Sequence, residues 1–599
     1  VMFILWIRIQ KDSSEVEWKY KDLTKVNPYS TILKMMPLIN QYNIPPKINN
    51  YRFDIKYIHE IEEQEYTINY PVVYILYDTE LKTVYVGEST NVINRLRNHL
   101  SHRNKKQLKQ IYIISCSLFN KSVSLDIESS LIMYFKKKGS TIFENVLNGN
   151  GGLANHGYYQ KYLYAKMVDK IWSKLKYDKV VHEDIIDIKN SDLFKYSPYK
   201  VLSPDQNSAI LDYLEILLLK DRSSVFIEGS AGTGKTILAV YLIKLLLSDY
   251  DPEDYENKDD NVRLKLERAK DVKEKISKIA LVVPMKSLRE TLKKVFISEK
   301  GLSASMVIGP SEVSRNEYDI LVVDEAHRLH RRRGITNYGS FDKCNQRLGL
   351  DNSGTELDWI KMRSNHQLFF YDDAQSIRPS DIPKEKFHDL KKQSETIKLK
   401  SQMRINSGGN YIQFVHSLLN PSIKEPINKF TNNSYDLKLF KSLPIMLKAL
   451  KKKEEELKLC RLIAGYSWKW VSRNTNQPDA IIDGESLTWN RVPHDWINST
   501  TQMNEMGCIH TTQGYDLNYA GIIFGKEIVY NEKSNSIDII RENYFDMKGR
   551  VGITDINELK IYIINIYKTL MYRGIKGSYI YCCDKKLHKY FSKYMTNIA

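Results

Sequence analysis

VFIEGSAGTGKT, residues 225–236, is the stretch that decides the fold of this chain. A short apolar run predicts a β-strand, a glycine-rich turn follows it, and a second apolar run over 237–247 predicts a helix. Gly229, Gly232 and Gly234 permit backbone dihedrals that other residues avoid, so successive N–H groups can converge at the start of that helix. Such a turn is a binding site for the phosphates of a nucleotide.

The residues of this turn fit the chemistry of ATP and Mg²⁺. Lys235 is expected to neutralise the β- and γ-phosphates, and the hydroxyl of Thr236 is expected to bind Mg²⁺. A glycine-rich turn that merely precedes a helix is the alternative, and the strand and helix on either side count against it. The predicted nucleotide-binding residues here are Gly229, Gly232, Thr233, Gly234, Lys235 and Thr236.

Composition narrows the class of protein. At 599 residues the chain is too long for one core. It has 89 Lys and Arg against 72 Asp and Glu, and the net charge of +17 favours a polyanionic partner such as nucleic acid. The six cysteines show no CxxC pairing, which argues against a disulfide framework or a zinc site and fits a reducing, cytoplasmic setting. The apolar run 1–7 ends at Arg8, too early for a membrane span, so no membrane partner is expected.

The pattern along the chain predicts an α/β multidomain fold. Residues 71–150 have a compact α/β pattern that ends in the turn cluster NGNGG, residues 148–152. From residue 202 onward, strands and helices alternate, which predicts parallel βαβ units. The expected segments are 1–70 (role unknown), 71–150 (small α/β domain with an antiparallel sheet), 151–201 (helical linker), 202–400 (first P-loop lobe) and 401–599 (second lobe).

Two further strand ends in the first lobe carry polar groups. ILVVDEAH, residues 320–327, predicts a strand that closes with Asp324 as an Mg²⁺ ligand and Glu325 as the group that orients an attacking water. LFFYDDAQ, residues 368–375, predicts a neighbouring strand whose Gln375 senses the γ-phosphate. Ordinary polar strand ends are the alternative for both.

This order of motifs resembles superfamily 1 helicases, and most closely the Schlafen-group-3-type DNA/RNA helicase domain, over about residues 202–585. The resemblance implies that Gln206 reads adenine and that 282–288 touches single-stranded nucleic acid. It also implies that Arg404 and Arg573 reach the γ-phosphate from the second lobe, since charge on the transferring phosphoryl must be met from both walls of the cleft.

The resemblance continues in GCIHTTQGYD, residues 507–516, which is similar to the motif that couples nucleotide to the nucleic-acid track. It adds Gln513 and Gly514 to the predicted nucleotide-binding residues. Asp516 departs from the Glu found in many members, and the DEAH string belongs by name to another superfamily. Residues 430–500 match no named motif, so strand separation and directional movement are less firmly indicated than ATP hydrolysis.

A second chemistry is indicated in residues 71–150. Residues 72–76 and 83–87 predict a β-hairpin, and a helix capped by Asn91 places Arg95 and His99 one turn apart. A second helix, about 124–138, carries Glu128 on an apolar face. An ionised carboxylate in such a place is costly unless a cation lies near it, so Glu128 needs a cation.

These residues resemble the GIY-YIG nuclease family, with Val73-Tyr74 and Tyr85-Val86-Gly87 as the two signatures. The resemblance implies that Glu128 binds a divalent metal, Mg²⁺ or alternatively Mn²⁺, and that Tyr74 or a water it positions generates the nucleophile. Tyr85 would support that water, and Arg95 would stabilise the phosphorane charge, with His99 taking part. Asn145 follows in the family's order. The segment is also basic, with 11 Lys and Arg against 6 Asp and Glu.

Together these features predict an ATP-dependent nucleic-acid enzyme in which a metal-dependent endonuclease is fused to a helicase-like ATPase. DNA is favoured over RNA, defence of a bacterium against foreign DNA is the expected setting, and a protein partner or a homo-oligomer is compatible with the sequence. One alternative is a nucleotide-gated sensor that does not move along nucleic acid. Another is a DNA-binding module with an inactive nuclease.

Overall fold

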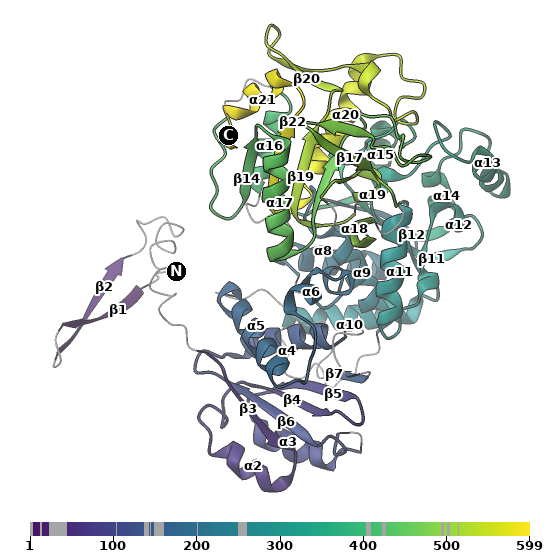
Figure 1. The fold of residues 1–599 in the computed structure, drawn as a ribbon. Coiled ribbons are helices and arrows are strands. Elements are labelled where there is room, and N and C mark those ends of the chain that lie inside the picture. Colours follow the sequence, from purple (N-terminus) through teal and green to yellow (C-terminus); the bar gives the residue numbers. More distant parts are fainter. Residues whose placement is uncertain are drawn as a thin grey trace.

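The computed structural model describes residues 4–11, 15–22, 45–103, 105–136, 143, 145–148, 161–200, 202–248, 260–402, 409–421, 427–492, 496–499, 503–512 and 514–598. The strands β1 (Ile4–Lys11) and β2 (Glu15–Asp22) pair as an antiparallel hairpin. The rest forms a small domain, residues 45–148, a helical linker and two larger lobes that lie together at the opposite end of the molecule from the small domain (Figure 1).

The small domain is a five-stranded sheet in the order β3-β6-β4-β5-β7. The predicted hairpin is present as β4 and β5, and the antiparallel sheet is confirmed for four strands, while β7 joins β5 in parallel. Both faces of this sheet are covered by other elements, since β4 is buried along its whole length. The elements are β3 (Lys47–Arg52), α2 (Ile55–Glu62), β4 (Val72–Asp78), β5 (Thr83–Ser89), α3 (Val92–Ser101), β6 (Gln110–Ser115), α4 (Lys121–Lys136) and β7 (Asn145–Asn148).

The sheet begins earlier in the chain than the segment 71–150. β3 pairs with β6 over 47–52, inside the stretch for which no role was predicted. Its sequence KINNYR has no continuous apolar run, since it is an edge strand that buries little of its surface. Helices α2 and α3 cover one face of the sheet, and α4 packs on the other with the linker helix α5 (Lys161–Tyr177).

The linker continues with α6 (Ile185–Asn190) and α7 (Asp192–Lys195) and leads into the first lobe. This lobe is a six-stranded, wholly parallel sheet in the order β10-β9-β11-β12-β8-β13. Its elements are α8 (Pro204–Leu219), β8 (Ser223–Glu228), α9 (Lys235–Leu247), α10 (Asp260–Lys275), β9 (Ile279–Val282), α11 (Lys286–Ser298), η2 (Ala304–Met306), β10 (Val307–Ile308), α12 (Pro310–Val313), β11 (Tyr318–Val323), η3 (Ala326–Arg328), α13 (Tyr338–Arg347), α14 (Glu356–Met362), β12 (Ser364–Tyr371), η4 (Asp373–Gln375), α15 (Lys384–Lys391) and β13 (Glu395–Lys398).

The second lobe is an eight-stranded sheet in the order β16-β17-β18-β15-β19-β22-β14-β23, parallel except for the pair β16 and β17. A separate hairpin joins β20 and β21. The elements are α16 (Gly409–Leu418), β14 (Asp436–Phe440), α17 (Leu443–Leu457), β15 (Cys460–Ala464), β16 (Ala480–Ile482), β17 (Glu485–Trp489), α18 (Trp496–Ser499), β18 (Glu505–Gly507), α19 (Ile509–Thr512), β19 (Leu517–Phe524), β20 (Ile528–Asn531), β21 (Ser536–Ile539), η5 (Arg541–Asn543), α20 (Ile556–Met571), β22 (Gly574–Cys582), α21 (Lys585–Ser592) and β23 (Thr596–Ile598).

The two lobes are packed against each other. Ala231 and Ile377 of the first lobe belong to the apolar cluster that fills the second lobe. Polar contacts reinforce this packing, since Arg378 forms a 3.1 Å ion pair with Asp546 and Asn565 donates to the carbonyl of Ser376. The α/β multidomain fold predicted from the sequence is therefore confirmed.

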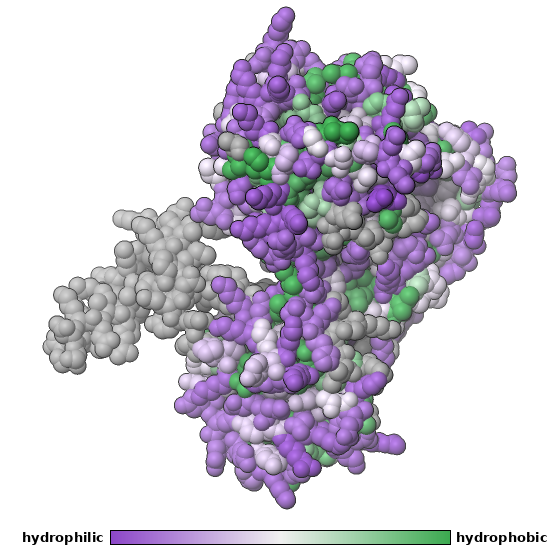
Figure 2. Space-filling model, in the orientation of Figure 1, coloured by the Kyte–Doolittle hydropathy of each residue, from purple (hydrophilic) through white to green (hydrophobic). Residues whose placement is uncertain are grey.

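The face drawn in Figure 2 is mostly hydrophilic, and hydrophobic residues appear on it in small separate groups. Within the described residues, no helix has both the length and the apolar character needed to cross a membrane.

Candidate active sites

The glycine-rich turn joins β8 to α9, as the sequence predicted. Gly232 and Gly234 have φ angles of 88° and 78°, and Gly234 is the N-cap of α9 in the left-handed region. A Cβ atom on Gly229 would lie 2.4 Å from the Thr233 hydroxyl, so the close turn excludes any side chain there. The Lys235 ammonium lies inside this turn, where it donates to the carbonyls of Gly229 and Ser230.

The two predicted Mg²⁺ ligands of the nucleotide site are in direct contact. The Thr236 hydroxyl donates to Asp324 Oδ2 at 2.8 Å, and Asp324 is fully buried at the end of β11. Burial and the adjacent Glu325 raise the pKa of Asp324. A hydroxyl and a buried carboxylate that converge beside a phosphate-binding turn are the oxygen ligands that Mg²⁺ uses, so these residues fit the ion.

Glu325 occupies an unusual backbone position. Its φ of 51° lies in the left-handed region, and its carboxylate lies 3.1 Å from His327 Nε2. Burial, the largest single influence, would raise the pKa of Glu325, but His327 and the nearby cations together lower it. Lys235 and Arg573 act in the same direction, so a cation from the second lobe acts on a carboxylate of the first.

Gln206 contacts the glycine-rich turn directly. It is fully buried in the first turn of α8, and its amide donates to the carbonyl of Thr233 at 2.8 Å. Ser203 and Gln206 form a reciprocal capping box that fixes the start of the helix. The neighbouring Asp205 accepts hydrogen bonds from the backbone N–H groups of Lys400 and Ser401, a contact that sequence reasoning missed.

Gln375 and Gly514, two further predicted residues of the nucleotide site, lie near the boundary between the lobes. Ile377 packs into the apolar cluster of the second lobe, and a Cβ atom on Gly514 would lie 3.3 Å from Leu288 of the first lobe. Gln375 is buried and donates to Asp372 Oδ2 at 2.6 Å, and Asp372 in turn lies 3.7 Å from Lys235. Sequence reasoning passed over Asp372, although it closes the same strand as the predicted glutamine. Gly514 has a φ of 90°. Arg404 and Gln513 lie outside the described residues.

Arg573 is almost fully buried between α20 and β22. Its guanidinium donates to the carbonyls of Thr569 and Tyr515, each at 3.3 Å. The bond to Tyr515 ties it to the 507–516 motif. Arg573 also lowers the pKa of Glu325, so it lies beside the predicted nucleotide site as well as against this motif.

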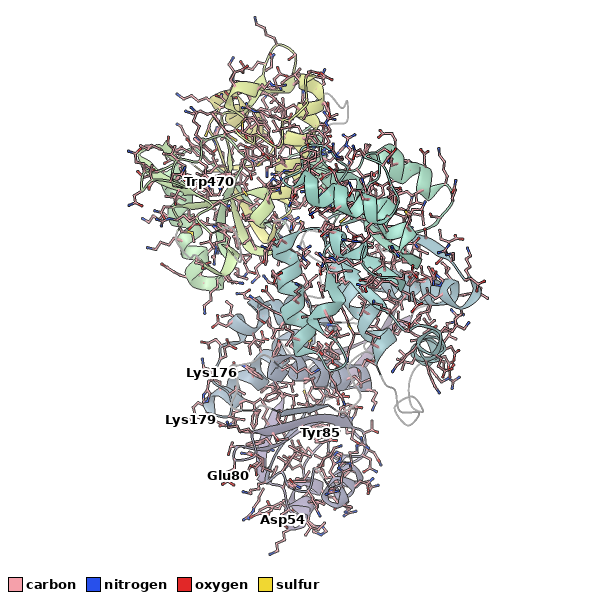
Figure 3. All side chains as sticks on the ribbon, turned by 90° about the vertical axis from the view of Figure 1, so that its right-hand side faces the viewer. Asp54, Glu80, Tyr85, Lys176, Lys179 and Trp470 are labelled. Carbon is pink, nitrogen blue, oxygen red and sulfur yellow. The ribbon has the colours of Figure 1, made fainter. Side chains whose placement is uncertain are left out.

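The predicted nuclease residues are brought together in the small domain. Tyr74 and Tyr85 lie on neighbouring strands with ring centroids 6.0 Å apart, and both are buried. The Tyr74 hydroxyl is 2.8 Å from His99 Nε2, and the ring of His99 packs edge-on against Tyr85. Figure 3 shows Tyr85 in the small domain, far from Trp470 of the second lobe.

Charges surround these two phenols. Burial raises the pKa of both Tyr74 and Tyr85, the Glu128 carboxylate adds to the effect on Tyr85, and the Arg95 guanidinium opposes it on both. Burial, together with nearby cations, lowers the pKa of His99 to about 3, so the imidazole is neutral at pH 7. The structure therefore gathers all five predicted residues around one point.

Glu128 is buried on α4, and its charge acts on Tyr85. Among the described residues no three His, Cys, Asp or Glu side chains converge. A divalent ion here would have one protein carboxylate, with water and phosphate oxygens as its other ligands. Mg²⁺ commonly binds in this way, so Glu128 fits such an ion.

Gly87 was part of the signature, and the structure shows why a glycine is needed there. A Cβ atom at this position would lie 2.5 Å from the Tyr74 hydroxyl oxygen and 2.9 Å from a ring carbon of Tyr85. The missing side chain thus makes room for both phenols.

The geometry defines a class of protein, a two-lobed P-loop ATPase joined to a small metal-dependent nuclease domain. Within that class, the model described as Schlafen group 3, DNA/RNA helicase domain, matches residues 222–584, more than half of the chain, and the chain belongs to this family. The model of the GIY-YIG catalytic domain matches residues 70–140. The two domains indicate nuclease and ATPase/helicase activity, with general use of nucleotide and divalent metal.

The individual proteins to which this chain is similar share only a small part of its sequence. The chain is 24% identical over 403 residues to the uncharacterized protein YPL245W of Saccharomyces cerevisiae, a match that covers 61% of this chain and 82% of the yeast protein. It is similar to a Pif1 helicase from Bacteroides solved with ADP-AlF3 and ssDNA (11% identity, 65% and 91% of the two chains, TM-score 0.24). It is also similar to the Pif1 helicase from Candida albicans (12% identity, 66% and 96%, TM-score 0.26). At these TM-scores the solved structures add nothing to the family assignment.

Proposed function

We propose that this protein is an ATP-dependent DNA enzyme in which a motor and an endonuclease act on the same polymer. The observation that carries the proposal is the convergence at Glu325, where Lys235 of the first lobe and Arg573 of the second act on one buried carboxylate. A site built from two lobes can link the state of a bound nucleotide to the angle between them. We propose that the chain is divided into the small nuclease domain, the linker and two motor lobes, each lobe built on one of the two large sheets.

In the motor, Lys235 and the N–H groups of 229–234 would bind the phosphates, and Thr236 and Asp324 would hold Mg²⁺. The ion would neutralise charge on the phosphates when bound. Glu325 would orient the attacking water, and Arg573, together with the predicted Arg404, would meet the charge from the opposite wall. Gln375 is bonded to Asp372, which lies 3.7 Å from Lys235, and Ile377, two residues after Gln375, packs into the second lobe.

In the nuclease, His99 is neutral and within hydrogen-bond distance of Tyr74, so it can hold the phenol in place by a hydrogen bond. Arg95 would stabilise the negative charge that builds on the oxygens of the phosphoryl group under attack, and Tyr85 would position the water. Glu128 would hold a divalent ion, Mg²⁺ or Mn²⁺, which supplies Lewis acidity at the phosphodiester.

The substrate and setting follow from chemistry common to both sites. The net charge of +17 supports a polyanion, and we propose DNA, with foreign DNA in bacterial defence as the biological role. All six cysteines are free thiols in the structure, which supports a reducing cytoplasm. Bacteria that carry the wild-type chain should give fewer phage plaques than bacteria without it, and bacteria that carry Glu128→Ala should give the normal number. Equal plaque counts with and without the wild-type chain would contradict this role.

The biochemical test uses the full chain with plasmid and linear DNA, with and without Mg²⁺ and ATP. We expect Mg²⁺-dependent nicking that Glu128→Ala abolishes while ATP hydrolysis continues. Lys235→Ala should abolish ATP hydrolysis. The matched control is Asp126→Ala, which removes a carboxylate two residues earlier on the same helix and should leave nicking normal. An ATPase rate unaffected by any DNA or RNA would show that the motor proposal is wrong.

A further inference from the structure

A lysine outside the predicted set lies at the nuclease site. Lys105 follows α3 in a turn closed by hydrogen bonds from the N–H groups of Lys105 and Lys106 to the carbonyl of His102. Its ammonium is 4.0 Å from the centroid of the Tyr85 ring, and the side chain is partly buried. This turn therefore places a cation against one of the two phenols.

Lys105 also faces the other groups of this site. After burial, Lys105 is the largest of the influences that lower the pKa of His99. Arg95, again after burial, lowers the pKa of Lys105 to about 8. These mutual effects show that two cations and a neutral imidazole share one small volume.

Neither cation has a carboxylate partner in the described part of the chain. Among the described residues, the ion pairs of the small domain involve other side chains, and the neighbours that act on the charge of Arg95 are the two phenols. Two like charges close together and half removed from water are unfavourable unless an anion lies between them. The nearby Glu128 acts on Tyr85, on the side where the metal ion is expected.

We propose that Lys105 is a further phosphate-binding residue of the nuclease and that, with Arg95, it grips a phosphodiester of the substrate strand beside Tyr85. The ligand is a nucleic-acid phosphate, and the inference rests on the proposed nuclease function. Arg95 offers a fork of donors and Lys105 a point charge, so the two can contact different oxygens of the strand. The contact would hold the strand against the phenols before the bond is broken.

The experiment measures single-turnover cleavage of a duplex oligonucleotide by the full chain, with rising enzyme concentration and at several KCl concentrations. Lys105→Ala should raise the half-saturating concentration at least tenfold at low salt. When the logarithm of the half-saturating concentration is plotted against log [KCl], the slope should be smaller by about one for Lys105→Ala, because one phosphate contact is lost. Lys105→Arg should restore most of the affinity, and Lys105→Met, which keeps the stem over Tyr85, should not.

Lys106→Ala is the matched control, since Lys106 is exposed in the same turn. ATP hydrolysis by each variant checks that the chain is folded. If the wild type cleaves and Lys105→Ala behaves like Lys106→Ala, the assignment of Lys105 is wrong while the nuclease stands. If Lys105→Met is as active as the wild type, the stem matters and the charge does not, which also overturns the assignment. A wild type that never cleaves would instead refute the nuclease function.

Discussion

At the scale of single residues, the nuclease site depends on an absent side chain as much as on those present. Gly87 lies between Tyr74 and Tyr85, and the space beside it is filled by the two phenols. In a close-packed interior, even one extra methyl group displaces the side chains around it. The position of each phenol is therefore set by its neighbours on the strands rather than by its own rotamer alone.

Gly87→Ala tests this dependence. The new methyl would push the Tyr74 hydroxyl away from His99, so we expect at least a hundredfold loss of DNA cleavage with ATP hydrolysis unchanged. Overpacking should also cost about 1–3 kcal/mol of domain stability. Cleavage assays and thermal unfolding measure the two effects. Thr83→Ala, a partly exposed position at the start of the same strand, is the control, and normal cleavage by Gly87→Ala would contradict the packing argument.

At the scale of elements, a buried carboxylate holds α20 against the second sheet. Glu527, fully buried just before β20, accepts a 2.6 Å hydrogen bond from the Tyr567 hydroxyl of α20. Its other oxygen has no hydrogen-bond partner among the described residues. Burial raises the pKa of Glu527 from 4.5 to about 7.

This shift predicts a pH dependence of stability. Because the folded-state pKa is raised, the folded form binds the proton more tightly, and this contribution to stability is complete below pH 4.5 and lost as pH rises through 7. Glu527→Gln cannot ionise, so it should be more stable than the wild type at pH 8, by up to about 3 kcal/mol, with little difference at pH 4.5. Urea unfolding at both pH values measures this. Exposed Glu532→Gln should show no such pH-dependent gap, and an equal gap for Glu527→Gln at both pH values would contradict the prediction.

The elements also show what sequence could and could not predict. The turn 225–236, the strand end at Asp324 and the hairpin 72–87 were predictable because local spacing alone specifies them. β3 was not, since its partner β6 is about sixty residues away and the register is set by pairing across the sheet. Asp205, Asp372 and Lys105 were missed for a related reason, because their roles come from residues that only the fold brings near.

At the scale of the whole molecule, the small domain is fixed to the first lobe by a buried cluster. Lys136, the last residue of α4, lies 3.2 Å from Glu299 at the end of α11 and donates to the Tyr199 hydroxyl at 2.7 Å. Tyr199 in turn donates to Glu299 at 2.8 Å. The helix that carries Glu128 is thus joined to the motor.

Replacement of Lys136 alone should destabilise the protein more than replacement of Lys136 and Glu299 together. Lys136→Met leaves Glu299 buried without its cation, which should destabilise the contact by about 3 kcal/mol, and addition of Glu299→Gln should recover part of that loss. Calorimetry of the full chain measures the transitions. Lys170→Met, on the linker helix, is the control, and additive losses in the double variant would contradict a coupled pair.

The linker makes a second set of contacts, and these limit how the protein can be dissected. Tyr196 donates to the carbonyl of Gly514 and Lys195 to that of Asp516, while Asn190 bonds to Leu457 and Asn518. A truncated polypeptide starting at residue 202 would retain the whole P-loop yet lose this strap across the second lobe. The rate of ATP hydrolysis by this fragment would then be that of a motor without the linker contacts. It would not represent the rate of the intact enzyme.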